Sequence, residues 1–122
     1  MTTQDDVRRI ALALPGVSES HDDFAFSVEV KGKAKGMAWS WKERVVPKKP
    51  RVPNFGVLAI RVANLGQKDL ILSSKPKQFV HDPHYDGYPA VLVRLDAVSV
   101  ADLEMLLTDA WRNLTTPPAR KR

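Results

Sequence analysis

The first repeat of hydrophobic positions in the chain has the period of a helix. Apolar side chains recur three and four residues apart at Val7, Ile10, Ala11 and Leu14. Thr3 and Asp6 precede them as a capping-box-like pair, with aspartate in place of the usual glutamate. Pro15 and Gly16 follow; proline cannot continue a helix, and glycine readily takes the left-handed conformation at its end. The pattern predicts an amphipathic helix over residues 3–14.

After a polar link at residues 18–23 the period changes to two, which is typical of strands with one buried face. The apolar side chains of the first strand are Phe24, Phe26, Val28 and Val30. The second strand carries Met37, Trp39 and Trp41 on one face, and Gly32 lets the chain reverse between the two strands. Three prolines within residues 45–54 predict an extended basic loop, and residues 55–62 form a third, almost continuously apolar strand.

The elements that follow are shorter. Asn64 caps a helix over residues 65–73, and residues 78–80 form a short strand. Residues 81–89 are rich in turn-forming side chains, and residues 90–95 form a further apolar strand. This part of the chain therefore adds one helix and two strands.

The last helix has the clearest pattern. Ser99 and Asp102 repeat the capping pair. The apolar stripe behind them consists of Val100, Leu103, Leu106, Leu107, Ala110 and Leu114. The element order is α-β-β-β-α-β-β-α, and such helices and strands bury one another best in two layers. We therefore predict one α+β domain over residues 1–114, an antiparallel sheet backed by helices, and a flexible basic tail over residues 115–122.

A series of short motifs runs from the first helix almost to Leu114. They are Leu14-Pro15-Gly16-Val17 followed by Glu19 and Phe24, the turn Val30-Lys31-Gly32-Lys33, Pro83-His84-Tyr85 before the strand at 90–95, and Ala110-Trp111-Arg112. In this order and spacing they resemble the MmcQ/YjbR family. The resemblance implies a YjbR-like two-layer fold, akin to frataxin-like and type III secretion chaperone-like proteins, and DNA binding, by which the family is described. Residues 45–54 are longer and more proline-rich than the family pattern, so surface contacts in that loop are not carried over.

Positive charge is concentrated in one segment of a chain whose formal net charge is +5. Between residues 31 and 53, Glu43 is the one acidic residue. The basic residues there are Lys31, Lys33, Lys35, Lys42, Arg44, Lys48, Lys49 and Arg51. Segregated positive charge attracts polyanions. Lysines on a hairpin also discourage strand edges from pairing with other chains, so both interpretations stay open.

The first interpretation predicts a nucleic-acid-binding module. Those eight side chains would contact phosphates without reading bases, because phosphate contacts are independent of sequence. Trp39 and Trp41, if exposed, would stack on unpaired bases; if buried, they belong to the core under the helices. The alternative is a protein-interaction, chaperone-like domain without catalytic activity, which holds a protein partner on its sheet face or an exposed edge.

Histidines and carboxylates are close together in residues 81–86. Such donors suit a transition metal, but Pro83 prevents a helix that would align them, and the chain has no cysteine. We therefore predict no metal and no cofactor. His84, Tyr85 and Arg94 lie near one strand end and are a candidate small-molecule pocket. Nucleophile-elbow, phosphate-loop and zinc-protease motifs are absent from the sequence, so we predict no catalytic residue and no enzyme activity.

Two further features concern the location of the protein. The first six residues are polar and acidic, unlike a signal peptide. Apolar runs all fall short of the roughly 20 residues that a membrane helix requires. We expect a soluble, cytoplasmic protein with no membrane association.

Overall fold

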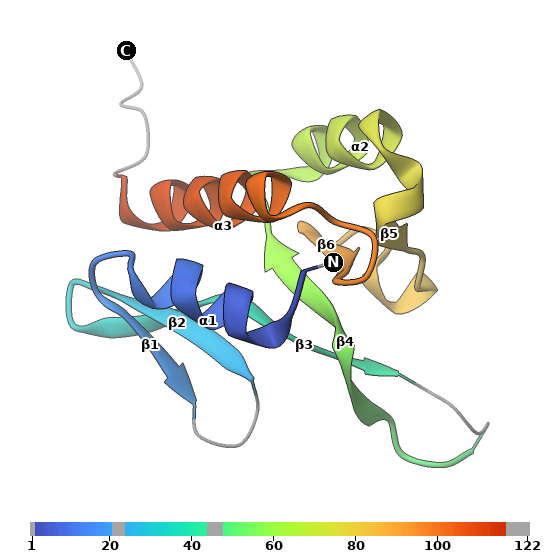
Figure 1. The fold of residues 1–122 in the computed structure, drawn as a ribbon, viewed down its shortest axis with the longest axis horizontal. Helices are drawn as coiled ribbons and strands as arrows, with labels where there is room; N and C mark the ends of the chain where they lie inside the picture. The colour runs from blue at the N-terminus through green and yellow to red at the C-terminus, as the bar shows by residue number, and fades with distance from the viewer. Residues whose placement is uncertain (1, 21–23, 44–47, 117–122) are drawn as a thin grey trace.

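The computed structural model describes residues 2–20, 24–43 and 48–116. Within them, an antiparallel sheet has the strand order β1-β2-β3-β4-β6-β5 (Figure 1). The strands are β1 (Val17–Ser20), β2 (Ala25–Val30), β3 (Lys33–Glu43), β4 (Val52–Arg61), β5 (Phe79–Val80) and β6 (Ala90–Arg94). The helices are α1 (Gln4–Leu12), α2 (Leu65–Ser74) and α3 (Val100–Thr115), with short 3-10 helices η1 (Pro76–Gln78) and η2 (Pro83–Tyr85). From residue 117 onward, the predicted tail lies outside the described residues.

α1 and α3 lie side by side against one face of the sheet (Figure 1). The main core lies between these two layers. It buries Leu103 and Leu107 of α3 against Phe26, Leu58 and other strand residues, each completely shielded from solvent. Burying one such side chain contributes roughly 1.5–3 kcal/mol. The predicted α+β class, with an antiparallel sheet backed by helices, is confirmed.

The observed order, α-β-β-β-β-α-β-β-α, has one strand more than the sequence predicts. β1 occupies part of the segment that was expected to be a polar link. Its Glu19 lies beside Phe26 in the register, and the Glu19 carboxylate accepts from Nε of Arg8 on α1 at 3.0 Å. This ion pair supports a polar edge strand that gives no hydrophobic period, which is why the pattern missed it.

The predicted helix starts are confirmed by their hydrogen bonds. Thr3 Oγ1 accepts from the Asp6 N–H at 3.2 Å, and Asp6 Oδ2 accepts from the Thr3 N–H at 2.9 Å. The side chains of Asn64 and Ser99 each accept from the backbone N–H three residues later, at 2.8 and 3.1 Å. The hydrogen bond from the Thr3 backbone is the largest cause of a lowered Asp6 pKa.

The chain reverses between β2 and β3 through a two-residue turn. Lys31 and Gly32 both have positive φ, 53° and 80°, and Val30 pairs with Lys33 across the turn. Positive φ at both central residues is the requirement of a type I′ hairpin, which matches the twist of the flanking strands. The predicted reversal at Gly32 is confirmed, and the turn presents lysines at the tip of the hairpin.

A bulge changes the facing of β3. The register passes from Phe26↔Ala38 to Ser27↔Gly36, so Met37 is an extra residue without a cross-strand partner. Such a bulge interrupts the period of two. Met37 is therefore buried in the main core, whereas Trp39 belongs to a second cluster. The prediction that Met37 shares a face with the two tryptophans is wrong.

Candidate functional site

The basic residues of the 31–53 segment form two groups at opposite ends of β3 (Figure 1). The turn group is Lys31, Lys33 and Lys35; the far group is Lys42, Lys48, Lys49 and Arg51. Lys35 and Lys42 are seven residues apart on one strand, which spans at most about 23 Å at a rise of roughly 3.3 Å per residue. Arg44 lies outside the described residues. The segment is thus continuous in sequence but divided in space.

Five of these side chains are available to a partner, whereas Arg51 is held by other residues of the domain. Arg51 Nη1 lies 2.9 Å from Asp82 Oδ2 and also donates to the Lys42 carbonyl at 2.8 Å. Five lysines of the two groups are exposed, and their ammonium groups make no ion pair or hydrogen bond in the described part of the chain. They are Lys31, Lys33, Lys35, Lys42 and Lys48. Arg51 is therefore structural, and these five lysines carry accessible positive charge in the 31–53 segment.

Asp82 joins the 81–88 loop (residues 81–88) to the sheet. Its carboxylate accepts from Trp41 Nε1 at 2.9 Å, from Arg51 Nη1 at 2.9 Å and from the His84 N–H at 3.0 Å. Burial by itself raises the pKa of Asp82, but the hydrogen bonds from Trp41, His84 and Arg51 outweigh it and lower the pKa to about 2. Asp82 is ionised at neutral pH, and its bonds to Trp41 and Arg51 fix the loop over the sheet.

Four aromatic side chains surround a shallow pocket of about 310 Å³ beside this loop. Trp39 Nε1 donates to the Tyr85 hydroxyl at 3.0 Å. The rings of Trp39 and Tyr88 are 6.3 Å apart, those of Tyr85 and Tyr88 are 5.9 Å apart, and His84 contacts Tyr85 at 5.8 Å, all edge to face. The Trp39 ring also lies over Gly36. The pocket thus combines one residue of β3 with three residues of the 81–88 loop.

Trp39 and Trp41 are predicted to stack on bases if exposed and to lie under the helices if buried, and the structure gives them different exposures. Both lie on the sheet face opposite α1 and α3, in a small cluster with Val57, Ala59 and Leu92. Trp41 is 8% exposed and bound to Asp82, whereas Trp39 is half-buried with part of its ring open. Their predicted place beneath the helices is wrong, because the 81–88 loop covers a second apolar face.

The structure separates the predicted pocket residues. His84 and Tyr85 line the aromatic pocket, whereas Arg94 lines a different cavity of about 470 Å³ beside Thr3 and Gln4 at the start of α1. Their nearness in sequence to one strand end did not bring them together, because β6 carries Arg94 away from the loop.

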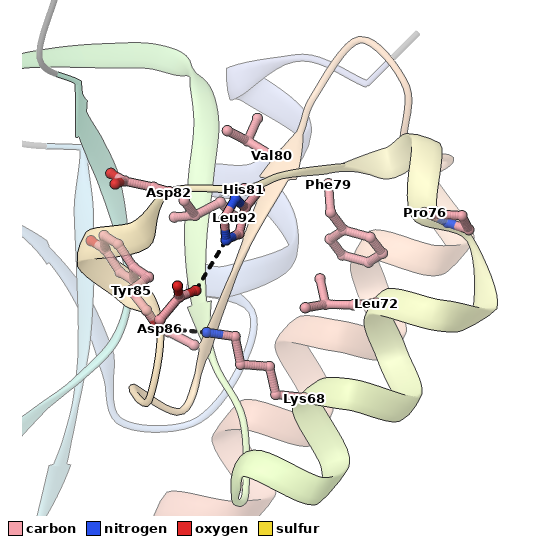
Figure 2. Close-up of a pocket in the computed structure, with 11 residues that line it drawn as sticks. Lys68, Leu72, Pro76, Phe79, Val80, His81, Asp82, Tyr85, Asp86 and Leu92 are labelled. Carbon is pink, nitrogen blue, oxygen red and sulfur yellow. Dashed lines mark hydrogen bonds and ion pairs between the residues drawn. The ribbon is translucent and has the colours of Figure 1, made fainter.

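A further cavity lies between α2, β5, β6 and the 81–88 loop, as Figure 2 shows. Lys68 Nζ donates to the Tyr85 and Tyr88 carbonyls at 2.6 and 2.9 Å. His81 Nε2 lies 3.1 Å from Asp86 Oδ1. Lys68 and Leu72 are not among the site residues predicted from the sequence; their spacing of four residues, which puts them on one helix face, is the signal that could have indicated them.

The donors of residues 81–86 do not converge on a metal site. His81 is engaged with Asp86, whereas Asp82 points to Trp41 and Arg51. Among the residues that the structure describes, no three His, Cys, Asp or Glu side chains are grouped to hold a metal ion. No helix among all the described residues is long and apolar enough to cross a membrane.

Comparison with known proteins identifies the class of domain. A crystal structure of Deinococcus radiodurans protein DR2400, with a DUF419 domain, matches with a TM-score of 0.65 at 24% identity, over 95% of this chain and 80% of that one. This chain therefore shares the fold of that DUF419 domain. No model of a known protein family matches the sequence.

Relatives at the sequence level place the chain in a family. The uncharacterized proteins Mb2600 of Mycobacterium bovis and Rv2570 of Mycobacterium tuberculosis are both 35% identical to it over 112 residues, which is 91% of this chain and 87% of theirs. The chain belongs to the same family as these mycobacterial proteins.

Proposed function

We propose that this domain is a nucleic-acid-binding module of the MmcQ/YjbR family that contacts phosphates without sequence selectivity. The proposal is carried by the five exposed lysines at the two ends of β3, which no carboxylate of the described residues neutralises. The ion pairs among the described residues are instead formed by Arg8, Arg9, Arg51, Lys75 and His81. Free lysines gain affinity for phosphate by releasing condensed counterions.

The division into two groups sets the length of the nucleic acid. The separation of at most about 23 Å along β3 corresponds to roughly seven base pairs at about 3.4 Å per base pair. A shorter duplex would reach the turn group or the far group, but not both. β3 therefore acts as a rigid spacer between two contact points.

A length series tests this spacing. Duplexes of about 5, 10, 15 and 20 base pairs would be titrated by fluorescence anisotropy at salt concentrations from about 50 to 200 mM. We expect a step in affinity between the two shortest duplexes and a log–log salt slope near −4 to −5 for the longer ones, because five contacts contribute about −0.9 each. Absence of binding at about 50 mM salt would reject the function.

Paired substitutions assign the contacts. Two double variants are used, Lys33→Gln/Lys35→Gln and Lys42→Gln/Lys48→Gln. Each should make the log–log salt slope less negative by about 1.8 and weaken binding of long duplexes. The control, Lys77→Gln/Arg94→Gln, removes the same charge from exposed positions outside both groups. If the control weakens binding as much, net charge alone would explain the binding and the two groups would not be sites.

A further inference from the structure

The cavity between α2, β5, β6 and the 81–88 loop has the size of a small-molecule site (Figure 2). Its volume is about 210 Å³. An engineered apolar cavity of about 150 Å³ accepts benzene. The space therefore admits one six-membered ring, or a branched aliphatic chain of similar size, with a small polar group attached.

The walls of the cavity are mainly apolar. Leu72 from α2 and Phe79 from β5 point toward one another on one side, as Figure 2 shows, and Val80 and Leu92 lie on the other. Small-molecule sites typically combine such a lining with a few placed polar groups that fix orientation. Here the polar groups belong to Lys68, His81, Asp82, Tyr85 and Asp86.

The charges of these polar groups indicate the sign of the ligand. The Asp82 carboxylate is already paired with Arg51, and the Asp86 carboxylate lies 3.1 Å from His81 at the exposed rim of the cavity. Lys68 is half-buried, and its two partners among the described residues are neutral backbone carbonyls. An ammonium group has three donors, so one remains. Lys68 is thus a cation in the cavity wall whose charge no described carboxylate neutralises.

We propose that this cavity binds a small monocarboxylate with an aryl or branched aliphatic body. The carboxylate accepts from the remaining donor of Lys68 Nζ, and the body packs against Leu72, Phe79 and Leu92. A bond between charged partners at the rim of an apolar site is stronger than a neutral one, so the charge contributes to selection as well as orientation.

Three ligands with one ring test the charge: phenylacetate, phenylacetamide and 2-phenylethylamine. Each would be titrated into the ¹⁵N-labelled protein and followed by amide shifts. We expect phenylacetate to bind with a Kd of roughly 0.1–1 mM and to shift the amides of Leu72, Val80 and Leu92. The neutral amide should bind about tenfold more weakly, and the amine more weakly still.

Single substitutions test the named side chains. Lys68→Gln should weaken phenylacetate about tenfold and leave phenylacetamide nearly unchanged. Asp86→Asn should tighten phenylacetate by about twofold, because it removes a negative charge at the exposed rim. Lys77→Gln, an exposed lysine on the neighbouring η1, is the matched control and should change nothing.

Lys68 also holds the 81–88 loop, so a second variant separates binding from folding. Leu72→Trp fills the cavity from a half-buried helix position and should abolish binding of all three ligands while the amide spectrum stays dispersed. Equal affinity for acid and amide, a preference for the amine, shifts outside the cavity, or no shift up to about 10 mM ligand would each overturn the proposal. Lys68 lies outside both lysine groups, so these results are independent of nucleic-acid binding.

Discussion

On one face of the sheet, two helices cover a continuous apolar core, whereas on the other face a short loop covers a few buried side chains. The helix face contains Leu103 and Leu107 among many completely buried residues. The loop face buries Trp41, Val57, Ala59 and Leu92. The 81–88 loop that covers this face is held by side-chain hydrogen bonds of Asp82 and Tyr85. Lys68 also donates to the Tyr85 carbonyl of the loop.

The difference shows two ways in which a sheet can be covered. Burial of apolar area is non-directional and grows with the area removed from water. Hydrogen bonds of a buried carboxylate are directional, and each one that is broken leaves a polar group without a partner. Among the described residues, no buried side-chain nitrogen or oxygen lacks a partner. The helix face should therefore be sensitive to lost volume, and the loop face to lost polar partners.

Leu107→Ala should produce the largest effect, since it deletes a completely buried side chain of the helix face. We expect a loss of about 2–5 kcal/mol in the free energy of unfolding, the sum of lost transfer energy and a residual cavity. Urea titration followed by circular dichroism measures it. The control is Leu70→Ala on α2, whose side chain is 67% exposed and whose loss should cost little. Similar costs for the two variants would contradict the importance of burial here.

The helix face is also the part that the sequence predicts. The helical spacing of Val7 and Ile10, and of Leu103 and Leu107, marks side chains that the structure buries. The capping pairs at Thr3 and Ser99 are local in sequence, so their bonds follow from spacing alone. The polar strand β1 escaped prediction, because an ion pair with α1 supports it.

The loop face could not be predicted, because its bonds join residues far apart in the chain. Asp82 meets Trp41 across 41 positions, and Tyr85 meets Trp39 across 46. Neither pair leaves a periodic signal, and the acidic and aromatic residues of 81–88 read equally well as a turn. The clustering of lysines was evident in sequence, but its division by the length of β3 required the strand to be seen in space.

The acid stability of the domain tests the polar attachment of the loop. The pKa of Asp82 is lowered from 3.8 to about 2, so its ionised form stabilises the folded state. This stabilisation, about 2 kcal/mol, is complete above about pH 4 and is lost as the pH falls toward 2. Asp82→Asn should therefore be less stable than the parent at neutral pH, with a difference that shrinks over this window. Urea titrations between about pH 2 and 7 measure it.

Two features make this measurement specific. Asp6 and Asp102 also have lowered pKa values, the latter mainly through a hydrogen bond from Gln78, but they are unchanged in the variant and cancel in the difference. Asp96→Asn is the charge-matched control. Asp96 is exposed, and its carboxylate makes no ion pair or hydrogen bond among the described residues. A pH-independent difference between the parent and Asp82→Asn would show that the charge of Asp82 does not stabilise the loop.

Tyr85→Phe should have the smallest effect, because it removes one hydroxyl and keeps the ring. The hydroxyl accepts from Trp39 Nε1 at 3.0 Å. Trp39 is half-buried, so in the variant its N–H can donate to water instead. We expect a loss of about 0.5–1 kcal/mol, at the low end for a hydrogen bond, since neither group is left buried without a partner.

Exchange of the indole protons reports this loss at one residue. In Tyr85→Phe, the Trp39 indole proton should exchange with solvent faster than in the parent, because its acceptor within the protein is gone. The Trp111 indole, which donates to the Pro15 carbonyl at 2.8 Å on the opposite side of the sheet, is the internal control and should keep its rate. Unchanged exchange at Trp39 would mean that apolar contact between the rings, rather than the hydrogen bond, holds Tyr85 on β3. The loop face would then resemble the helix face more closely than its polar bonds suggest.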